Sequence, residues 1–441
     1  MSSTLILGGL IAIAVLLWLL WEWRDSVKEK AVRAEAADVA GMGEVVPTSL
    51  HPVIDPNMCM GSGACVAICP EHGPLGLIGN RAVLVNPLGC VGHGACEAAC
   101  PVSAIRLVFG TKTRGVELPE VGPTFETNQP GVYIVGELGG MGLIRNAVSQ
   151  GAQAVQHIAK GSDTGVRRGV GSALDLLVVG AGPAGISATL GGMQAKLRTL
   201  LVEREALGGT ITHYPRAKVV MTGPLDFPLF GRVKKKTMSK EALISLWRQI
   251  MAQCQLPLAT GHVVERITRQ QNDMWLVESS TQKWEAANVV LALGMRGSPR
   301  KLGVPGEELE KVAYRLLEPD PFAGKHVLIV GGGNSAVESA LSLADFGRCA
   351  SVAISYRRDA FARCRGDNRR RIEEAIQGGR VRALMPSNLS AIEPNRVLLK
   401  GADGSVEALQ NDAVIAQIGG TAPADLLKTF GINLVTKYGE R

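Results

Sequence analysis

Short apolar runs recur through the second half of the chain, and glycine-rich turns follow them. The run from Leu174 to Val179 is broken only by Asp175, which predicts a buried strand of a parallel sheet. A second run, HVLIV at 326–330, has the same form and is also followed by a glycine turn. Strand, turn and helix in this order predict the α/β class, with two Rossmann-like dinucleotide-binding domains.

The start of the chain follows a different pattern. The stretch from Leu5 to Trp21 holds no charged residue, and a helix of this length just spans the core of a bilayer. Trp18, Trp21 and Trp23 gather at one end, as an interfacial belt would. A basic segment before the run and a small-residue cleavage site after it are both missing, which argues against a cleaved signal peptide. The pattern therefore predicts one transmembrane helix over residues 1–23.

Basic residues lie on one side only of this apolar stretch. Arg24, Lys28, Lys30 and Arg33 follow it, and no basic residue precedes it. The positive-inside rule then places the bulk of the protein in the cytoplasm. We expect a single-pass protein of a bacterial inner membrane with its soluble domains facing the cytoplasm, and a charged helical stalk and linker over residues 24–50.

Composition narrows the classes of protein that remain. With 441 residues the chain is long enough for two or three domains, each with its own core. The net charge of +7 is modest, and 40 acidic residues are mixed with 47 basic ones, which argues against a nucleic-acid partner. Nine cysteines are present, and six of them lie between Cys59 and Cys100. That crowding predicts metal ligation in a reducing compartment, not a disulfide framework.

The glycine turn after the first strand has the spacing of a dinucleotide-binding loop. Gly180 permits the tight turn, Gly182 lets a pyrophosphate approach the backbone, and Gly185 lets helix and strand pack closely. The helix N-terminus would hold the phosphates. A second strand ends at Glu203, where an acid binds the ribose hydroxyls of an adenosine. The predicted cofactor-binding residues are Gly180, Gly182, Pro183, Ala184, Gly185 and Glu203.

The cysteines form an internal repeat with a spacing of 31 residues. The two copies are CMGSGACVAICP at 59–70 and CVGHGACEAACP at 90–101. They resemble the bacterial two-cluster ferredoxin, in which the last cysteine of each run binds the other iron–sulfur cluster. The resemblance implies two crossed ligand sets in an α+β ferredoxin-like module: Cys59, Cys65 and Cys100 for one cluster, and Cys90, Cys96 and Cys69 for the other.

The second ligand position of each run departs from the ferredoxin pattern. Ser62 stands there in the first run and His93 in the second. Serine is a poor iron ligand, whereas histidine is a competent one, so we expect His93 to ligate and Ser62 not to. The alternative is a pair of three-iron clusters in which both residues only fill space, so each cluster is 4Fe-4S or 3Fe-4S. Zinc binding by the same cysteines is disfavoured, because the Cys-Pro endings and the repeat are typical of clusters.

The second nucleotide fold differs from the first at the end of its second strand. The text GGGNSAVESA places Gly331, Gly333, Asn334 and Ser335 at the start of a helix. The following strand ends in Arg357-Arg358 instead of an acid, with Arg363 beyond. The planar guanidinium group of arginine can bind the 2′-phosphate that NADPH has and NADH lacks, so these residues predict NADPH over NADH. The alternative is a basic surface cluster that continues through Arg369, Arg370 and Arg371.

Three further stretches resemble the thioredoxin-reductase-like flavoproteins. The text TNQPGVYIVGE at 127–137 is similar to the C-terminal flavin motif of that family, with Glu137 in place of the usual Asp after Gly136. GGTITHYPRAKVV at 208–220 resembles the loop that contacts the flavin, and 288–308 matches the return to the flavin domain. The resemblance implies FAD as the cofactor of the first fold, with Gly136, Glu137, Gly209, Thr210 and Gly294 as further binding residues.

The order of these stretches departs from the family. The flavin motif, which closes the FAD domain in the family, here precedes both nucleotide folds. The end of the chain, 418–441, resembles the segment that leads into that motif. We therefore interpret the chain as circularly permuted, with the cut in an exposed hairpin and the ferredoxin module at the new N-terminus.

The redox dithiol of the family is missing. Thioredoxin reductases have a CxxC in the nicotinamide domain, and the matching stretch 311–325 contains no cysteine. We therefore expect a membrane-anchored NAD(P)H oxidoreductase, not a disulfide reductase. Hydride would pass from the nicotinamide to FAD, and single electrons would pass to the clusters. No side chain is assigned as a catalytic acid or base. Reverse flow that reduces NADP⁺, and a redox or oxygen sensor with little turnover, remain alternatives.

The expected partners are NAD(P)H, the membrane, and an electron-transfer protein or membrane redox carrier, with a homodimer as one arrangement. In chain order, the expected domains are the anchor 1–23, the stalk 24–50, the ferredoxin-like module 51–108, the permuted flavin segment 109–160, a linker 161–173, the FAD domain 174–297, the NAD(P)H domain 298–415, and the return to the FAD domain 416–441.

Overall fold

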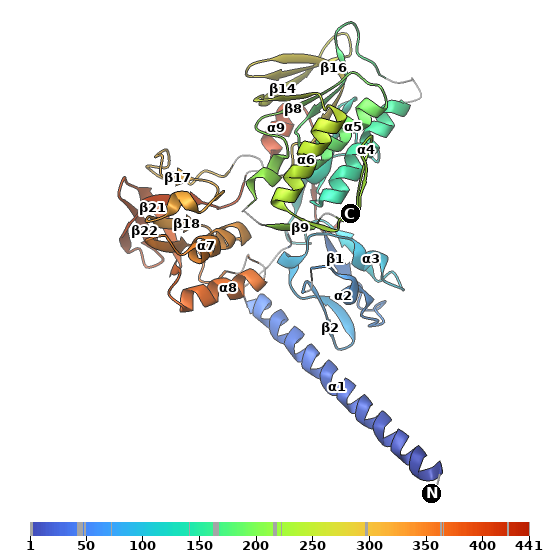
Figure 1. Cartoon of the computed structure of the whole chain (residues 1–441), viewed down its shortest axis with the longest axis vertical. Coiled ribbons are helices and arrows are strands. Elements are labelled where there is room, and N and C mark those ends of the chain that lie inside the picture. The colour runs from blue at the N-terminus through green and yellow to red at the C-terminus, as the bar shows by residue number, and fades with distance from the viewer. Residues whose placement is uncertain are drawn as a thin grey trace. The chain divides into compact units, whose positions relative to one another are not determined.

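The computed structural model divides the chain into two compact units, Met1–Gly110 with Glu440–Arg441, and Thr111–Gly439 (Figure 1). The described residues are 3–41, 47, 50–71, 73–140, 142–161, 167–214, 218–221, 223–295, 299–361, 364, 366–420 and 423–440; for 3–10, 41 and 221 only the backbone is described.

The first unit begins with one long helix, α1 (Ser3–Gly41). Its charged second half packs against the hairpin strand β2 (Leu75–Ile78). Glu29 Oε1 accepts a hydrogen bond from the Gly79 N–H at 3.0 Å. A Cβ at Gly76 would lie 2.5 Å from Val32 Cγ1, so this close contact requires the glycine.

Among the described residues, no helix is both long and apolar enough to cross a membrane. This finding overturns the transmembrane helix predicted over 1–23, and with it the inner-membrane location. The side chains of residues 1–10, on which part of that prediction rested, lie outside the described residues.

The rest of the first unit is a small α+β module with two matching halves. Its outer strands pair antiparallel, with His51 opposite Val108, and its inner strands form a hairpin, with Leu75 opposite Leu84. The short helices of the two cysteine runs contact each other. The elements besides β2 are β1 (His51–Ile54), α2 (Ala64–Ile68), β3 (Arg81–Leu84), η1 (Pro87–Gly89), α3 (Ala95–Ala98) and β4 (Ile105–Val108).

The second unit contains a seven-stranded sheet in the order β13-β8-β7-β16-β15-β14, with β6 paired to β16. The strands β6, β7, β8, β13 and β16 run parallel, so their carboxyl ends lie at one edge. Apolar side chains from both faces of the sheet form its core. The strands are β6 (Val132–Ile134), β7 (Leu174–Val179), β8 (Thr199–Glu203), β13 (Leu258–Thr260), β14 (Val264–Arg269), β15 (Trp275–Ser279) and β16 (Lys283–Leu291).

The C-terminal segment joins this fold beside the start of the second unit. Strand β25 (Leu434–Lys437) pairs antiparallel with β5 (Val116–Pro119). The Asn128 side chain donates to Gly431 O at 2.9 Å and accepts from the Asn433 N–H at 2.9 Å. Residues some 300 positions apart are thus neighbours, which is the arrangement that the circular permutation predicts.

A second parallel sheet has the order β17-β24-β18-β19-β20 and is accompanied by the antiparallel meander β21-β22-β23. Helices α7 and α8 pack on its core. The elements are β17 (Val312–Ala313), η4 (Asp320–Phe322), β18 (His326–Val330), α7 (Asn334–Phe346), β19 (Ser351–Ser355), α8 (Gly366–Gln377), β20 (Arg382–Leu384), β21 (Ser387–Ile392), β22 (Arg396–Gly401), β23 (Val406–Gln410) and β24 (Ala413–Ala416).

The second unit also contains shorter strands, further helices and two 3-10 turns. They are η2 (Gly136–Gly139), α4 (Ile144–Lys160), α5 (Pro183–Gln194), η3 (Gly209–His213), β9 (Val219–Met221), β10 (Leu225–Phe227), β11 (Gly231–Val233), β12 (Thr237–Ser239), α6 (Lys240–Cys254) and α9 (Ala424–Thr429).

Candidate functional site

The first glycine loop links β7 to α5 at the carboxyl edge of the large sheet. Gly180 has a φ of 104°, and a Cβ there would lie 2.5 Å from Ala292 O. A Cβ at Gly185 would lie 1.8 Å from Gly180 O. A Cβ at Gly182 would meet nothing within 4 Å, so the backbone there faces open space. The loop thus combines a tight turn at Gly180, close helix–strand packing at Gly185 and open space at Gly182, and a pyrophosphate there stays a prediction.

Glu203 lies at the end of β8 and is only 7% exposed. Its Oε2 accepts from the Ala181 N–H at 2.7 Å, and its Oε1 accepts from the Glu205 N–H at 3.0 Å. The carboxylate is thus held beside the glycine loop by backbone donors. Each oxygen keeps a second lone pair with which it can accept a ribose hydroxyl.

Two further predicted loops lie near the glycine turn. The Gly208 N–H donates to Ala181 O at 2.9 Å, and a Cβ at Gly209 would lie 3.3 Å from Gly182 Cα. Thr210 follows in η3. Gly294, with a φ of 67° and open space at its Cβ position, follows β16 at the same sheet edge. The carboxyl ends of parallel strands therefore bring these segments together.

The flavin motif at 127–137, which precedes both nucleotide folds in this chain, lies against the first turn of α5. Gly136 has a φ of 83°, and its Cβ position is 3.0 Å from Ala184 Cβ. Its N–H donates to Gln150 Oε1 of α4 at 2.7 Å. Gly151 of α4 approaches so closely that a Cβ would lie 2.2 Å from Ala184 O. The segment that contains Gly136 thus packs against the helix that follows the glycine loop.

The second glycine loop links β18 to α7. Gly331 has a φ of 139°, and a Cβ there would lie 2.3 Å from Gln417 O. Gly333 caps the helix with open space at its Cβ position, and Asn334 and Ser335 begin the first turn. The Asn334 Oδ1 accepts from Asn368 Nδ2 at 3.2 Å. This geometry suits a second pyrophosphate at a helix N-terminus.

The arginines after β19 differ from those on α8 in their ion pairs. Arg357 is exposed and Arg358 is half-buried, and neither has a hydrogen bond or ion pair with another described residue. Arg370 and Arg371 of α8 instead bind Asp367 and Asp345 at 3.1 and 3.3 Å. The first pair is therefore available to a phosphate, whereas the second is already matched by carboxylates. The predicted Arg363 lies outside the described residues.

Cysteines of the two runs lie near one another in the structure. Burial raises the pKa of the Cys96 thiol to about 11, and nearby Cys90 and Cys69 add to the rise. Burial also raises the pKa of Cys65, with smaller contributions from Cys59 and Cys100. Each set thus combines two cysteines of one run with the last cysteine of the other.

The backbone around the cysteines has the features of a cluster site. Four glycines with left-handed φ of 71–78° precede the two short helices: Gly61, Gly63, Gly92 and Gly94. The Ala82 N–H donates to Cys59 Sγ at 3.4 Å, and the Ala104 N–H donates to Cys100 Sγ at 3.2 Å. Thiolates in N–H rich turns fit iron–sulfur clusters. Among the described residues, no three His, Cys, Asp or Glu side chains form a group that could hold a single metal ion.

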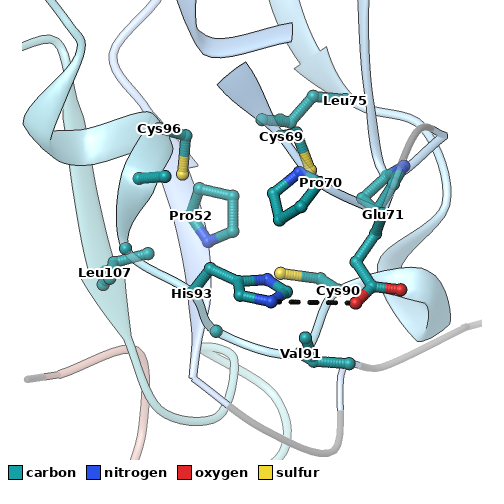
Figure 2. A pocket seen from close by; sticks show the side chains of 14 residues that line it. Pro52, Cys69, Pro70, Glu71, Leu75, Cys90, Val91, His93, Cys96 and Leu107 are labelled. Carbon is teal, nitrogen blue, oxygen red and sulfur yellow. Dashed lines mark ion pairs between the residues drawn. The ribbon is translucent and has the colours of Figure 1, made fainter. Parts of the chain in front are cut away.

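One cysteine set lines a pocket with His93 (Figure 2). Its walls include Cys69, Cys90 and Cys96, and Glu71 lies opposite the imidazole. His93 Nε2 is 3.8 Å from Glu71 Oε1, and the two side chains are only 12% and 14% exposed. At the equivalent position of the other set, Ser62 is exposed. The two sets therefore differ at this position, which holds a mostly buried histidine in one run and an exposed serine in the other.

The comparisons with known proteins agree with this geometry. A model of the pyridine nucleotide-disulphide oxidoreductase family matches residues 177–439, which is more than half of the chain. The chain belongs to the pyridine nucleotide-disulphide oxidoreductase family. A model of the 4Fe-4S dicluster domain matches residues 51–101. The chain is thus an FAD-dependent NAD(P)H oxidoreductase with iron–sulfur clusters, and it resembles thioredoxin-reductase-like flavoproteins fused to a ferredoxin module.

Individual relatives each match about three fifths of the chain. The ferredoxin–NADP reductase of Ignicoccus hospitalis is 28% identical over 59% of this chain and 82% of its own length. The bacilliredoxin reductase of Bacillus subtilis is 25% identical over 60% of this chain and 82% of its own. The solved bacillithiol disulfide reductase of Bacillus cereus has a TM-score of 0.53 at 21% identity, over 59% of this chain and 82% of that one, and shows the shared fold.

Several residues of these sites were missed by the sequence analysis. A Cβ at Gly332 would lie 2.4 Å from the Tyr356 ring, so this middle glycine is required by packing. Gln417 Oε1 is buried beside the same loop with no hydrogen-bond partner among the described residues. Glu71 was missed because its partner His93 is 22 residues away. Only the Cys-Pro-Glu order, which the second run lacks, distinguished it in the sequence.

Proposed function

We propose that this oxidoreductase passes electrons between NADPH, FAD and two iron–sulfur clusters, and exchanges them with a separate one-electron partner. The observation that supports this is a combination on one chain: two nucleotide folds, a dicluster module, and no cysteine at 311–325 where the resembling reductases have their dithiol. Without a dithiol, two-electron transfer to a disulfide has no relay. A flavin can accept hydride and release single electrons, which is the chemistry that FAD supplies here.

The nucleotide site supports NADPH as the donor. Arg357 and Arg358 follow β19, where dinucleotide folds bind the adenosine ribose. Their charges are not matched by described carboxylates, and guanidinium forks bind phosphate through charge-assisted hydrogen bonds. The N-terminus of α7 behind Gly333 would hold the pyrophosphate. Arg363, which lies outside the described residues, is proposed as a third contact.

The flavin site is assembled from both sides of the permutation. Gly180, Gly182 and Gly185 with Pro183 and Ala184 would hold the pyrophosphate at the start of α5, and Glu203 would bind the ribose. Gly136 and Glu137 would close over the cofactor, together with the loop segments at Gly209, Thr210 and Gly294. Helix α4 begins soon after this motif, at Ile144. Its positive end would stabilise negative charge on the flavin.

The clusters would be held by the two cysteine sets. Cys59, Cys65 and Cys100 would bind one cluster, and the exposed Ser62 would not contribute. Cys90, Cys96 and Cys69 would bind the other, with His93 as its fourth ligand, because the imidazole lies inside the pocket that these thiols line. Relatives named ferredoxin–NADP reductase support a one-electron protein as the partner.

Anaerobic mixing of the intact protein with NADPH tests this route. We expect flavin bleaching first, followed by an EPR signal from reduced clusters, and steady reduction of an artificial one-electron acceptor. Flavin reduction without any cluster signal would contradict the route. Cluster reduction with negligible turnover would instead favour a sensor. Net NADP⁺ reduction when the clusters are reduced chemically would show that the reverse direction is accessible.

A further inference from the structure

The pseudo-symmetry of the ferredoxin-like module exposes a pair of residues that occurs at one cluster site only. Adding the repeat spacing of 31 residues to Glu71 leads to Val102, and subtracting it from His93 leads to Ser62. One site therefore has histidine and glutamate, and the equivalent site has serine and valine. Both members of the pair change together between the two halves.

In space the pair meets across the pocket of one cysteine set. Glu71 follows Cys69 and Pro70 in the first run, whereas His93 lies between Cys90 and Cys96 in the second (Figure 2). The nitrogen that faces the carboxylate is Nε2, at 3.8 Å from Oε1. Both side chains are nearly nine-tenths buried, so solvent screens their interaction little.

We propose that Glu71 is a positioning residue for His93. Its carboxylate holds the imidazole ring at the Nε2 edge, and Nδ1 is then the nitrogen that binds iron. The inference rests on the proposed ligation by His93. A neutral imidazole has one donor and one acceptor nitrogen, and the partner of the donor decides which nitrogen is free for a metal. Histidines that bind metals usually donate their other ring N–H to a carboxylate, which fixes the ring and makes the ligand more basic.

The pair also sets the two clusters apart electronically. Replacement of a cysteine thiolate by a neutral histidine raises the reduction potential of a cluster. A buried carboxylate beside the ligand adds negative charge and opposes part of that rise, because reduction adds a further negative charge. The site with Ser62 and Val102 has neither residue. The His93 cluster therefore has a potential that depends on Glu71, and the other cluster does not.

The test uses the intact holoprotein reduced with dithionite, so it does not depend on NADPH or on the flavin route. Pulsed EPR of the wild type should show nitrogen coupling on one cluster, and His93→Ala should abolish it. Glu71→Gln keeps a hydrogen-bond acceptor but removes the charge, so the coupling should persist while the midpoint potential of that cluster alone rises. Glu71→Ala should weaken the coupling and release iron to a chelator about tenfold faster.

Two further variants separate positioning from general damage to the module. Asp55→Asn removes a charge from the same unit, at a side chain that accepts from the Asn57 N–H at 2.8 Å, and should leave the His93 cluster unchanged. The double variant S62H/V102E copies the pair into the other half and should create a second nitrogen-coupled cluster. Absence of nitrogen coupling in the wild type would overturn the proposal. Glu71 variants that leave coupling, potential and iron release unaltered, or that shift both clusters equally, would also overturn it.

Discussion

The Cβ position of Gly136 lies 3.0 Å from Ala184 Cβ, so a glycine from before both nucleotide folds packs on the first turn of the flavin-loop helix. A side chain at position 136 would need space that Ala184 occupies. It would also strain a backbone φ of 83°, at about 1–2 kcal/mol.

Gly136→Ala should therefore weaken FAD binding by about tenfold, since about 1.4 kcal/mol corresponds to a factor of ten. Flavin content after purification and the Kd for added FAD measure this loss. Gly122→Ala is the matched control, because a Cβ there meets only Glu126 O at an ordinary 3.6 Å. Equal flavin retention in the two variants would remove Gly136 from the site.

Replacing Arg357 and Arg358 with glutamine should raise the KM for NADPH far more than that for NADH. Each lost charge-assisted phosphate contact is worth about 1.5–3 kcal/mol, or one to two decades. Steady-state kinetics with both nucleotides measure the ratio. Arg370→Gln, on an exposed residue that binds Asp367, should leave the ratio unchanged. Equal losses with both nucleotides would mean that the two arginines only shape the surface.

Shortened chains test which part holds the flavin. A chain that begins at residue 111 retains β5, β6 and α4, so it should bind FAD and accept hydride but reduce one-electron acceptors poorly. A chain that begins at residue 165 lacks all three elements and should lose FAD. Absorption spectra and hydride-transfer rates compare the two. Flavin retained by the shorter chain would contradict the permuted site.

The crossed cysteine sets predict which replacements act on the same cluster. Cys69→Ser should alter the EPR signal that Cys96→Ser alters, although Cys69 is only four residues from Cys65. Cys65→Ser should alter the other signal. The double variant of Cys69 and Cys96 should lose no more iron than the more affected single variant. Shared effects of Cys65 and Cys69 on one cluster would show that each run binds its own cluster.

Acid should weaken the second unit through Asp175, which is 3% exposed. Burial alone would raise the pKa of Asp175, but hydrogen bonds from Arg198 and from the Gly169 N–H outweigh it and lower the pKa to about 2. A lowered pKa stabilises the fold above the ordinary value near 4, and the effect is lost as the pH falls through 2. A shift of nearly two units corresponds to about 2 kcal/mol.

Denaturant unfolding of the wild type and Asp175→Asn should therefore differ most at neutral pH, with a gap that narrows from about pH 5 downward. Asp226→Asn, which removes an exposed carboxylate paired to Arg232 at 3.6 Å, should show almost no gap at any pH. A gap for Asp175 that stays constant between pH 7 and pH 3 would assign its effect to packing instead of charge.

Features that depend on local backbone were accessible from the sequence. The spacing of Gly180, Gly182 and Gly185 predicted an open loop and a close helix contact, because each role is decided within a few residues. The cysteine repeat predicted the two sets through its resemblance to ferredoxins, and the displaced flavin motif predicted the permutation in the same way.

Other features arise only when distant segments meet. The pairing of β6 with β16 joins Val132 to Val289, and no local pattern encodes which strand a short apolar segment will join. The ring of Tyr356 makes Gly332 necessary, and Glu71 reaches His93 across a pocket. The sequence by itself determined the kinds of chemistry, since residue type and short spacing specify the loops and ligands. Only the tertiary structure decided that the Glu71 carboxylate lies beside the His93 imidazole, because that contact depends on how the two halves of the module pack.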